Sequence, residues 1–257
     1  MHDDELLDTL VVAAERVRLV LSEIDDWLPV TERAGQYRID VAADAVAVDV
    51  LVDAGLGVLS EESGAHHPDR EVVVVLDPVD GSTNASRGIP WYATSLCAVD
   101  VGGPRVALVV NQASGERFDA VRGGGARCDG QSVRPSGCED LGQAIVCLSG
   151  FPSRHWGWGQ FRALGAAALD LCYVAAGRLD GFAGIARDGL GPWDYLGGLL
   201  VCQEAGAVVV DEAGRDLVVL DHEVRRYPLA AANETLLAQL AAASALPSDG
   251  DGVPDVP

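Results

Sequence analysis

Apolar side chains recur every three or four positions along two stretches near the start of the chain, and this spacing predicts two amphipathic helices. In the first stretch the apolar positions are Leu6, Leu7, Leu10, Val11, Ala14, Val17, Val20, Leu21 and Ile24. The second helix is expected over 41–54. Gly55 follows it, and glycine adopts the left-handed conformation that ends many helices.

Strand-like patterns follow these two helices. Two short apolar runs, 56–60 and 71–76, predict buried strands, and the second is nearly pure valine. From 93 to 121, apolar runs alternate with glycine-containing turns, which is typical of an antiparallel meander.

The second half of the chain alternates between the two patterns. Helices are predicted over 161–176, 193–205 and 233–243, and strands over 179–182, 207–210, 217–220 and 229–232. A run of strands followed by alternating elements indicates a layered α/β or α+β fold, in which sheets lie between layers of helices.

The length of 257 residues suits one large domain or two halves that share a core. We expect a single domain over 1–246 with halves of about 1–140 and 141–246. The last residues, 247–257, are rich in proline, aspartate and glycine, and this composition predicts a disordered tail.

The charge balance narrows the classes of partner. The chain has 18 basic and 39 acidic residues, a net charge of −21, and every basic residue is arginine. Because such a surface repels a phosphate backbone, we expect no nucleic-acid partner. The absence of lysine excludes a catalytic Schiff base and a P-loop lysine.

The sequence also predicts a cytoplasmic protein without a membrane partner. It holds no apolar run of the ~20 residues that a membrane span needs, and its first residues are acidic where a signal peptide is basic. The cysteines show neither a CxxC pair nor zinc-ligand spacing, so we expect buried free thiols. They are Cys97, Cys128, Cys138, Cys147, Cys172 and Cys202.

The segment 72–84 carries the most informative chemistry. An apolar strand ends in Asp77 and Asp80, within a turn shaped by Pro78 and Gly81. A buried carboxylate is costly unless it is paired, and an environment of oxygen ligands alone suits Mg²⁺. Residues 81–84 resemble the start of a helix, where N–H groups and the helix dipole favour a phosphate.

A plainer interpretation is a strand that ends in an Asx turn followed by helix-capping residues. Two other acidic positions weigh against it. Glu61 and Glu62 follow another predicted strand, and Asp194 stands at the start of a helix, where it also fits as a cap. Carboxylates at several element ends, without a Cys/His cluster, favour a magnesium site, because clustered carboxylates repel one another without a cation.

Three segments resemble motifs of the inositol monophosphatase family, the lithium-sensitive, magnesium-dependent phosphatases. The family's GEE, DPxDGTTN and WDxAxG motifs correspond to Ser60-Glu61-Glu62, Asp77-Pro78-Val79-Asp80-Gly81-Ser82-Thr83-Asn84 and Trp193-Asp194-Tyr195-Leu196-Gly197-Gly198. Landmarks between them also match, so the similarity spans roughly residues 6–240. The resemblance implies a layered α-β-α-β-α sandwich and a homodimer.

The resemblance also implies roles for individual residues. Two or three Mg²⁺ ions are expected in the site: Glu61, Asp77 and the Val79 carbonyl would hold one, and Asp77, Asp80 and Asp194 another. The backbone N–H groups of Gly81 and Ser82 would bind the phosphate. The remaining substrate contacts would come from Val79, Gly165, Ala167 and Asp194. Besides Glu61, the catalytic residues would be Ser82, whose hydroxyl helps to activate the attacking water, and Asp44, its partner in the second helix.

The implied activity is hydrolysis of a small sugar or polyol phosphate monoester by metal-activated water, with inositol-1-phosphate as the default substrate. Fructose-1,6-bisphosphatase or histidinol-phosphatase activity is an alternative, and a non-catalytic phosphate-binding regulator is the rival. The stretch 177–194 is about three residues longer than the family pattern leads us to expect. The family's sugar-binding acidic residue therefore has no clear match: Gly184 falls there by count, and Asp188 is a candidate substitute.

The five histidines do not cluster at ligand spacing, and we interpret them as surface or loop residues. They are His2, His66, His67, His155 and His222. The pair His66-His67 follows the two glutamates, so a place at the mouth of the site is the alternative.

Overall fold

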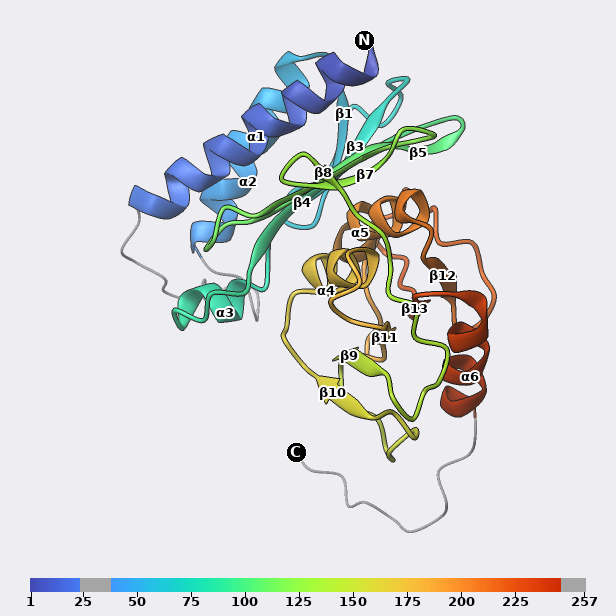
Figure 1. Cartoon of the computed structure of the whole chain (residues 1–257). Helices are drawn as coiled ribbons and strands as arrows, with labels where there is room; N and C mark the ends of the chain where they lie inside the picture. The colour runs from blue at the N-terminus through green and yellow to red at the C-terminus, as the bar shows by residue number, and fades with distance from the viewer. Residues whose placement is uncertain (24–37, 246–257) are drawn as a thin grey trace.

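Two β-sheets alternate with layers of helices through the molecule (Figure 1). The computed structural model describes residues 1–23 and 38–245. Ile24 and the tail predicted over 247–257 lie outside the described residues. The helices are α1 (Asp3–Glu23), α2 (Arg38–Asp53), α3 (Ser82–Ser86), α4 (Ala167–Ala175), α5 (Pro192–Ala205) and α6 (Glu234–Ser244).

The larger sheet has the strand order β2-β1-β3-β4-β5-β6-β7-β8. Its strands are β1 (Gly57–Ser60), β2 (Gly64–His66), β3 (Val73–Asp80), β4 (Ala93–Asp100), β5 (Gly103–Asn111), β6 (Arg117–Val121), β7 (Gly125–Cys128) and β8 (Gln131–Ser132). Strands β4 to β6 form the predicted antiparallel meander. By contrast, β1 and β3 are parallel, so their carboxyl ends lie at the same edge of the sheet.

The smaller sheet has the order β10-β9-β11-β13-β12. Its strands are β9 (Ile145–Ser149), β10 (Gln160–Arg162), β11 (Gly181–Gly184), β12 (Val208–Asp211) and β13 (Pro228–Ala231). Strand β9 is parallel to both β10 and β11, whereas β13 is antiparallel to both of its neighbours.

Three apolar clusters hold the layers together. Residues of α1 and α2 bury one face of the larger sheet, α4 and α5 fill the space between the two sheets, and α6 covers the outer face of the smaller one (Figure 1). This arrangement confirms the predicted α-β-α-β-α sandwich.

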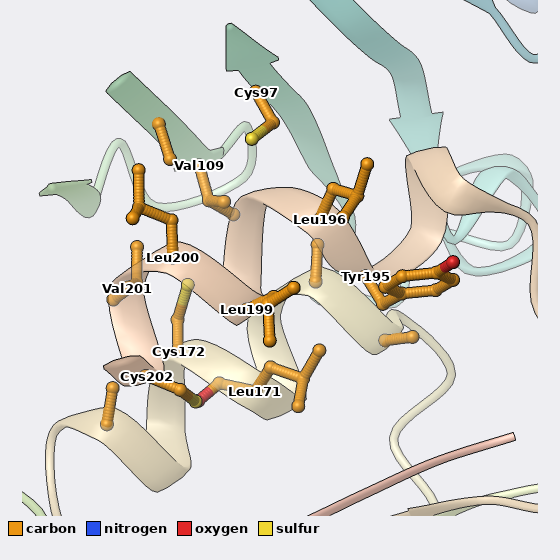
Figure 2. Close-up of a cluster of buried hydrophobic side chains, with 14 of the residues drawn as sticks. Cys97, Val109, Leu171, Cys172, Tyr195, Leu196, Leu199, Leu200, Val201 and Cys202 are labelled. Atoms are coloured by element: carbon orange, nitrogen blue, oxygen red, sulfur yellow. The ribbon is translucent and has the colours of Figure 1, made fainter. Parts of the chain in front are cut away.

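The central layer depends on very close packing of α5. In Figure 2 its side chains lie between Cys97 and Val109 of the larger sheet and Leu171 and Cys172 of α4. A Cβ atom at Gly198 would stand 2.5 Å from the Leu171 Cβ, so glycine is required for the two helices to approach this closely.

Two predicted elements are wrong. Residues 161–176 do not form one helix: β10 occupies the start of this range, and α4 begins only at Ala167, after Gly165 with φ +88°. Residues 217–220 form no strand, because the Leu217 carbonyl accepts a 2.9 Å hydrogen bond from the Tyr195 hydroxyl rather than from a neighbouring strand. The prediction also missed β2, β7, β8, β9 and β10.

Two further predictions concern the cysteines and membrane-spanning helices. All six cysteines are free thiols and all but Cys138 are buried, as expected. In the described part of the chain no helix is both long and apolar enough to cross a membrane.

Candidate active site

Three acidic side chains from distant parts of the chain meet at one point. One carboxylate oxygen from each of Glu61, Asp77 and Asp194 lies within 4.8 Å of the other two. Glu61 directly follows β1, Asp77 lies in β3, and Asp194 lies in the first turn of α5. Parallel pairing of β1 and β3 places the first two side by side, and the Glu61 N–H donates a 3.1 Å hydrogen bond to the Leu76 carbonyl.

An irregularity in β3 shapes the chain around Asp77. The register with β4 passes from Asp77 opposite Ser95 to Asp80 opposite Ala93, so Pro78 and Val79 together face the single residue Thr94. Proline, which lacks an N–H donor, is tolerated at such a bulge.

Side-chain hydrogen bonds fix the bulge. The Thr94 hydroxyl donates to the Pro78 carbonyl at 2.9 Å, and the Val79 N–H donates to Asp77 Oδ1 at 2.9 Å. The Asx-turn hydrogen bond of the plainer interpretation is therefore present, but it lies within β3 rather than at its end, and α3 has no side-chain cap.

Asp80 lies beside the three converging carboxylates and connects them to α4. Its Oδ2 accepts a 2.7 Å hydrogen bond from the Ala168 N–H, in the first turn of that helix. Its charge also contributes to raising the pKa of Asp77 and of Asp194. Ala167, one of the expected substrate contacts, therefore lies next to this carboxylate.

Asp194 has two structural relationships at once. Its Oδ2 accepts a 2.7 Å hydrogen bond from the Gly191 N–H, which is the helix-capping arrangement that the sequence allowed. From the first turn of α5, the Asp194 carboxylate also reaches Glu61 and Asp77. Capping and membership of the cluster are compatible.

The pKa values of the clustered carboxyl groups are all raised. Burial is the largest cause and repulsion between neighbouring carboxylates adds to it. The pKa of Glu61 rises to about 8 and that of Asp194 to about 7, while those of Asp77 and Asp80 lie well above their ordinary value. Bound cations would reverse this repulsion, and a set of carboxylate oxygens fits a hard divalent ion such as Mg²⁺.

Gly81 allows the chain to turn from this cluster directly into α3. Its φ is +88°, and a Cβ atom there would stand 2.9 Å from the Gly165 carbonyl oxygen and 3.0 Å from that of Trp91. Helices α3, α4 and α5 all begin beside the acidic cluster. Because helix N-termini carry partial positive charge and free N–H groups, this part of the molecule suits an anion as well as cations.

The predicted partnership of Asp44 with Ser82 is wrong. Asp44 is buried, and its Oδ1 accepts a short hydrogen bond from the Ser60 hydroxyl. Among the described residues the Ser82 side chain makes no hydrogen bond. Asp40, one turn earlier on α2 and also buried, is the residue of this helix whose charge raises the pKa of Glu61. The spacing of Asp40 and Asp44 was a usable signal, since residues four apart lie on one face of a helix.

His222 and Arg225 were also missed as neighbours of the site. The His222 Nε2 atom lies 2.9 Å from the Glu61 carbonyl oxygen, and its ring centroid is 4.6 Å from that of Trp193. The Arg225 guanidinium lies 5.0 Å from the centroid of the same Trp193 ring. His222 lies in a turn and is partly exposed, as expected of a loop residue, but this turn also places its ring against the backbone of Glu61.

The two positions considered for the family's sugar-binding acid, Gly184 and Asp188, differ in their surroundings. A Cβ atom at Gly184 would stand 2.9 Å from Pro228 and 3.0 Å from Leu190, so a side chain has no room at this position. Asp188 lies exposed in the loop that follows β11.

Fold and site together define a layered α/β protein whose buried carboxylates and helix N-termini suit divalent cations and an anionic group. Residues 36–245 match the sequence profile of the inositol monophosphatase family. The chain belongs to this family, whose members are phosphatases that generally depend on magnesium.

Individual proteins are similar to the chain over most of its length. The Nus factor SuhB of Salmonella typhimurium is 38% identical over 194 residues, which cover 68% of this chain and 71% of that protein. The fructose-1,6-bisphosphatase of Pyrococcus furiosus is 31% identical over 76% of this chain and 77% of its own length. The solved structure of an inositol monophosphatase from Anabaena is 26% identical, with a TM-score of 0.77 over 93% of this chain and 95% of that one.

Proposed function

We propose that this protein is a magnesium-dependent phosphatase that hydrolyses the phosphate monoester of a small sugar or polyol, with inositol-1-phosphate as the default substrate. The observation that carries the proposal is the meeting of Glu61, Asp77 and Asp194 beside the start of α3. An oxygen-only site for cations, next to helix N-termini that favour an anion, is what a phosphate ester needs for binding.

The proposal gives each residue of the site a task. Glu61, Asp77 and the Val79 carbonyl would hold one Mg²⁺ ion, and Asp77, Asp80 and Asp194 a second. Such ions neutralise charge on the phosphoryl group and make water a better nucleophile near neutral pH. The N–H groups of Gly81 and Ser82 would bind phosphoryl oxygens.

Other residues would act around the phosphoryl group. The Ser82 hydroxyl, partly buried and without a side-chain partner among the described residues, is free to orient the attacking water. Because Asp40 rather than Asp44 acts on Glu61, we assign the acidic role on α2 to Asp40 and a structural role to Asp44.

Two alternatives have specific support. The Pyrococcus furiosus relative is named a fructose-1,6-bisphosphatase, which favours a sugar bisphosphate as the second candidate substrate. Other relatives are named Nus factors rather than enzymes, which keeps a non-catalytic regulator as the rival. These names also give no support to the expected absence of a nucleic-acid partner, which rests on the net charge of −21 alone.

Phosphate release from a panel of monoesters, with Mg²⁺ and with or without Li⁺, tests the proposal. We expect turnover of a sugar or polyol ester that falls at least about 100-fold in Asp77→Asn and Asp194→Asn. Asp49→Asn, an exposed carboxylate on α2, is the matched control and should retain full activity.

Turnover that is unchanged in the two site variants would refute the site. No turnover of any ester by the wild-type protein would favour the regulator. The homodimer and the cytoplasmic location stay predictions, of which sedimentation velocity tests the first.

A further inference from the structure

Two loops pack together beside the acidic cluster and form a rim. One, 185–191, connects β11 to α5, and the other, 221–227, precedes β13. Leu190 and Arg226 exchange two backbone hydrogen bonds of 2.8 and 2.9 Å, and a Cβ atom at Gly189 would stand 3.0 Å from the Arg225 Cβ. The first loop lies within 177–194, the stretch that is about three residues longer than the family pattern, so the rim belongs to a region that differs from the family where alcohol recognition is expected.

Arg225 occupies a defined position on this rim. Its guanidinium stacks on Trp193, the residue before Asp194, and its Nη1 donates to the carbonyls of His222 and Val224 at 2.7 and 3.0 Å. His222 in turn contacts Trp193 and the Glu61 carbonyl. The guanidinium is therefore held close to the carboxylates, and its charge lowers the pKa of Asp194 in opposition to burial.

In the described part of the chain no carboxylate oxygen lies within 4.0 Å of the Arg225 guanidinium, so Arg225 forms no ion pair. Other arginines of this acidic protein, such as Arg178 and Arg215, form ion pairs with carboxylates. Among the described residues its Nε and Nη2 atoms also make no hydrogen bond. These are the donors with which a guanidinium binds a phosphate or a carboxylate.

From this geometry we infer that Arg225 binds a second anionic group, on the alcohol part of the substrate. The inference rests on the proposed function, because it needs a phosphoryl group bound at the acidic cluster and the start of α3. Within the proposed sugar and polyol esters, it favours those whose alcohol carries a further phosphate or a carboxylate over inositol-1-phosphate, whose alcohol carries neither. Arg225 would then act as a specificity-determining residue.

Matched substrate pairs test this role in the Mg²⁺-loaded protein. Fructose-1,6-bisphosphate and fructose-1-phosphate differ only in the second phosphate, and 2-phosphoglycerate and glycerol-2-phosphate differ in a carboxylate. In Arg225→Gln we expect kcat/KM for the doubly anionic member of one pair to fall about 10- to 100-fold, mainly through KM. The other member should change less than about twofold, and the pair that responds identifies the anionic group.

A control variant removes the same charge one residue away. In Arg226 the guanidinium is bonded to the backbone carbonyls of Asp216 and Arg225, so Arg226→Gln should leave both substrate pairs nearly unchanged. A readout apart from turnover is calorimetric titration of the product fructose-6-phosphate. We expect Arg225→Gln to bind it at least about 10-fold more weakly than the wild-type protein, and Arg226→Gln to bind it equally well.

The outcomes separate the two proposals. If the wild-type protein hydrolyses monoesters but Arg225→Gln affects both members of each pair equally, Arg225 acts only on Asp194 and the inference is overturned. Equal responses of Arg225→Gln and Arg226→Gln would overturn it as well. If the wild-type protein hydrolyses no ester, the proposed function itself fails, and unaltered product binding by Arg225→Gln would then reject the inference independently.

Discussion

The Asp80 carboxylate accepts a 2.7 Å hydrogen bond from the backbone N–H of Ala168, which lies 88 residues further along the chain. A strand of the larger sheet thereby caps the helix that packs against the smaller one. The candidate site lies where the larger sheet meets the helices between the two sheets, and the geometry of its carboxylates depends on how these layers pack.

The metal-free protein should lose stability as the pH rises. The folded-state pKa values of Asp194 and Glu61, about 7 and about 8, lie above the ordinary values of 3.8 and 4.5. The folded state thus binds more protons than the unfolded state in this window. The free energy of unfolding therefore falls from about pH 4 until both groups have ionised. Between pH 6 and pH 9 we expect Tm to drop by about 4 to 8 °C in the presence of a chelator.

Addition of Mg²⁺ should reverse most of this loss, since cations bind the ionised carboxylates of the folded state. Scanning calorimetry at several pH values, in constant salt, measures both effects. The variant Glu61→Gln should flatten the pH dependence. The same slope in this variant would show that the general repulsion of a protein with net charge −21, and not this site, sets the trend.

Substitution of Gly81 should be more destabilising than substitution of another left-handed glycine. Gly81 and Gly88 have φ of +88° and +69°, but only at Gly81 would a Cβ atom meet backbone oxygens, at 2.9 and 3.0 Å. We expect Gly81→Ala to cost about 2 to 4 kcal/mol and Gly88→Ala about 1 to 2 kcal/mol. Urea denaturation compares them, and equal losses would mean that the turn adapts to the added methyl group.

Removal of the Ser60 hydroxyl should destabilise the fold. This hydroxyl donates to the buried Asp44 carboxylate, and a buried acceptor deprived of its donor costs about 1 to 3 kcal/mol. For a chain of this size we expect Tm of Ser60→Ala to fall by about 3 to 10 °C. Ser22→Ala, which removes an exposed hydroxyl at the end of α1, is the control and should leave Tm within about 1 °C. An unchanged Tm in Ser60→Ala would remove the structural role assigned to Asp44.

In contrast to Ser60, the Ser82 hydroxyl should matter for activity and not for stability. Its hydroxyl is partly buried and makes no hydrogen bond to the described residues, so Ser82→Ala should leave Tm almost unchanged. If the hydroxyl orients the attacking water, kcat falls about 100-fold in this variant. Ser82→Thr keeps the hydroxyl and should retain most of the activity. Full activity of Ser82→Ala would exclude the proposed role.

The spacing of apolar residues correctly predicted those elements that bury one regular face. The first two helices, the meander from β4 to β6 and the final helix have the expected positions, because their apolar residues recur with the period of the element that they form. The acidic motif around Asp77 and Asp80 was also identified, since a strand that ends in two carboxylates requires partners for them.

The sequence by itself determined the class of fold, the family and the acidic residues of the site. Only the tertiary structure decided where α4 begins, because its cap is a carboxylate that approaches from β3. It likewise decided that Asp44 pairs with Ser60, that Asp40 acts on Glu61, and that His222 and Arg225 border the site. Each of these relationships joins side chains from different elements, and periodicity along one segment carries no information about which other segment will lie across from it.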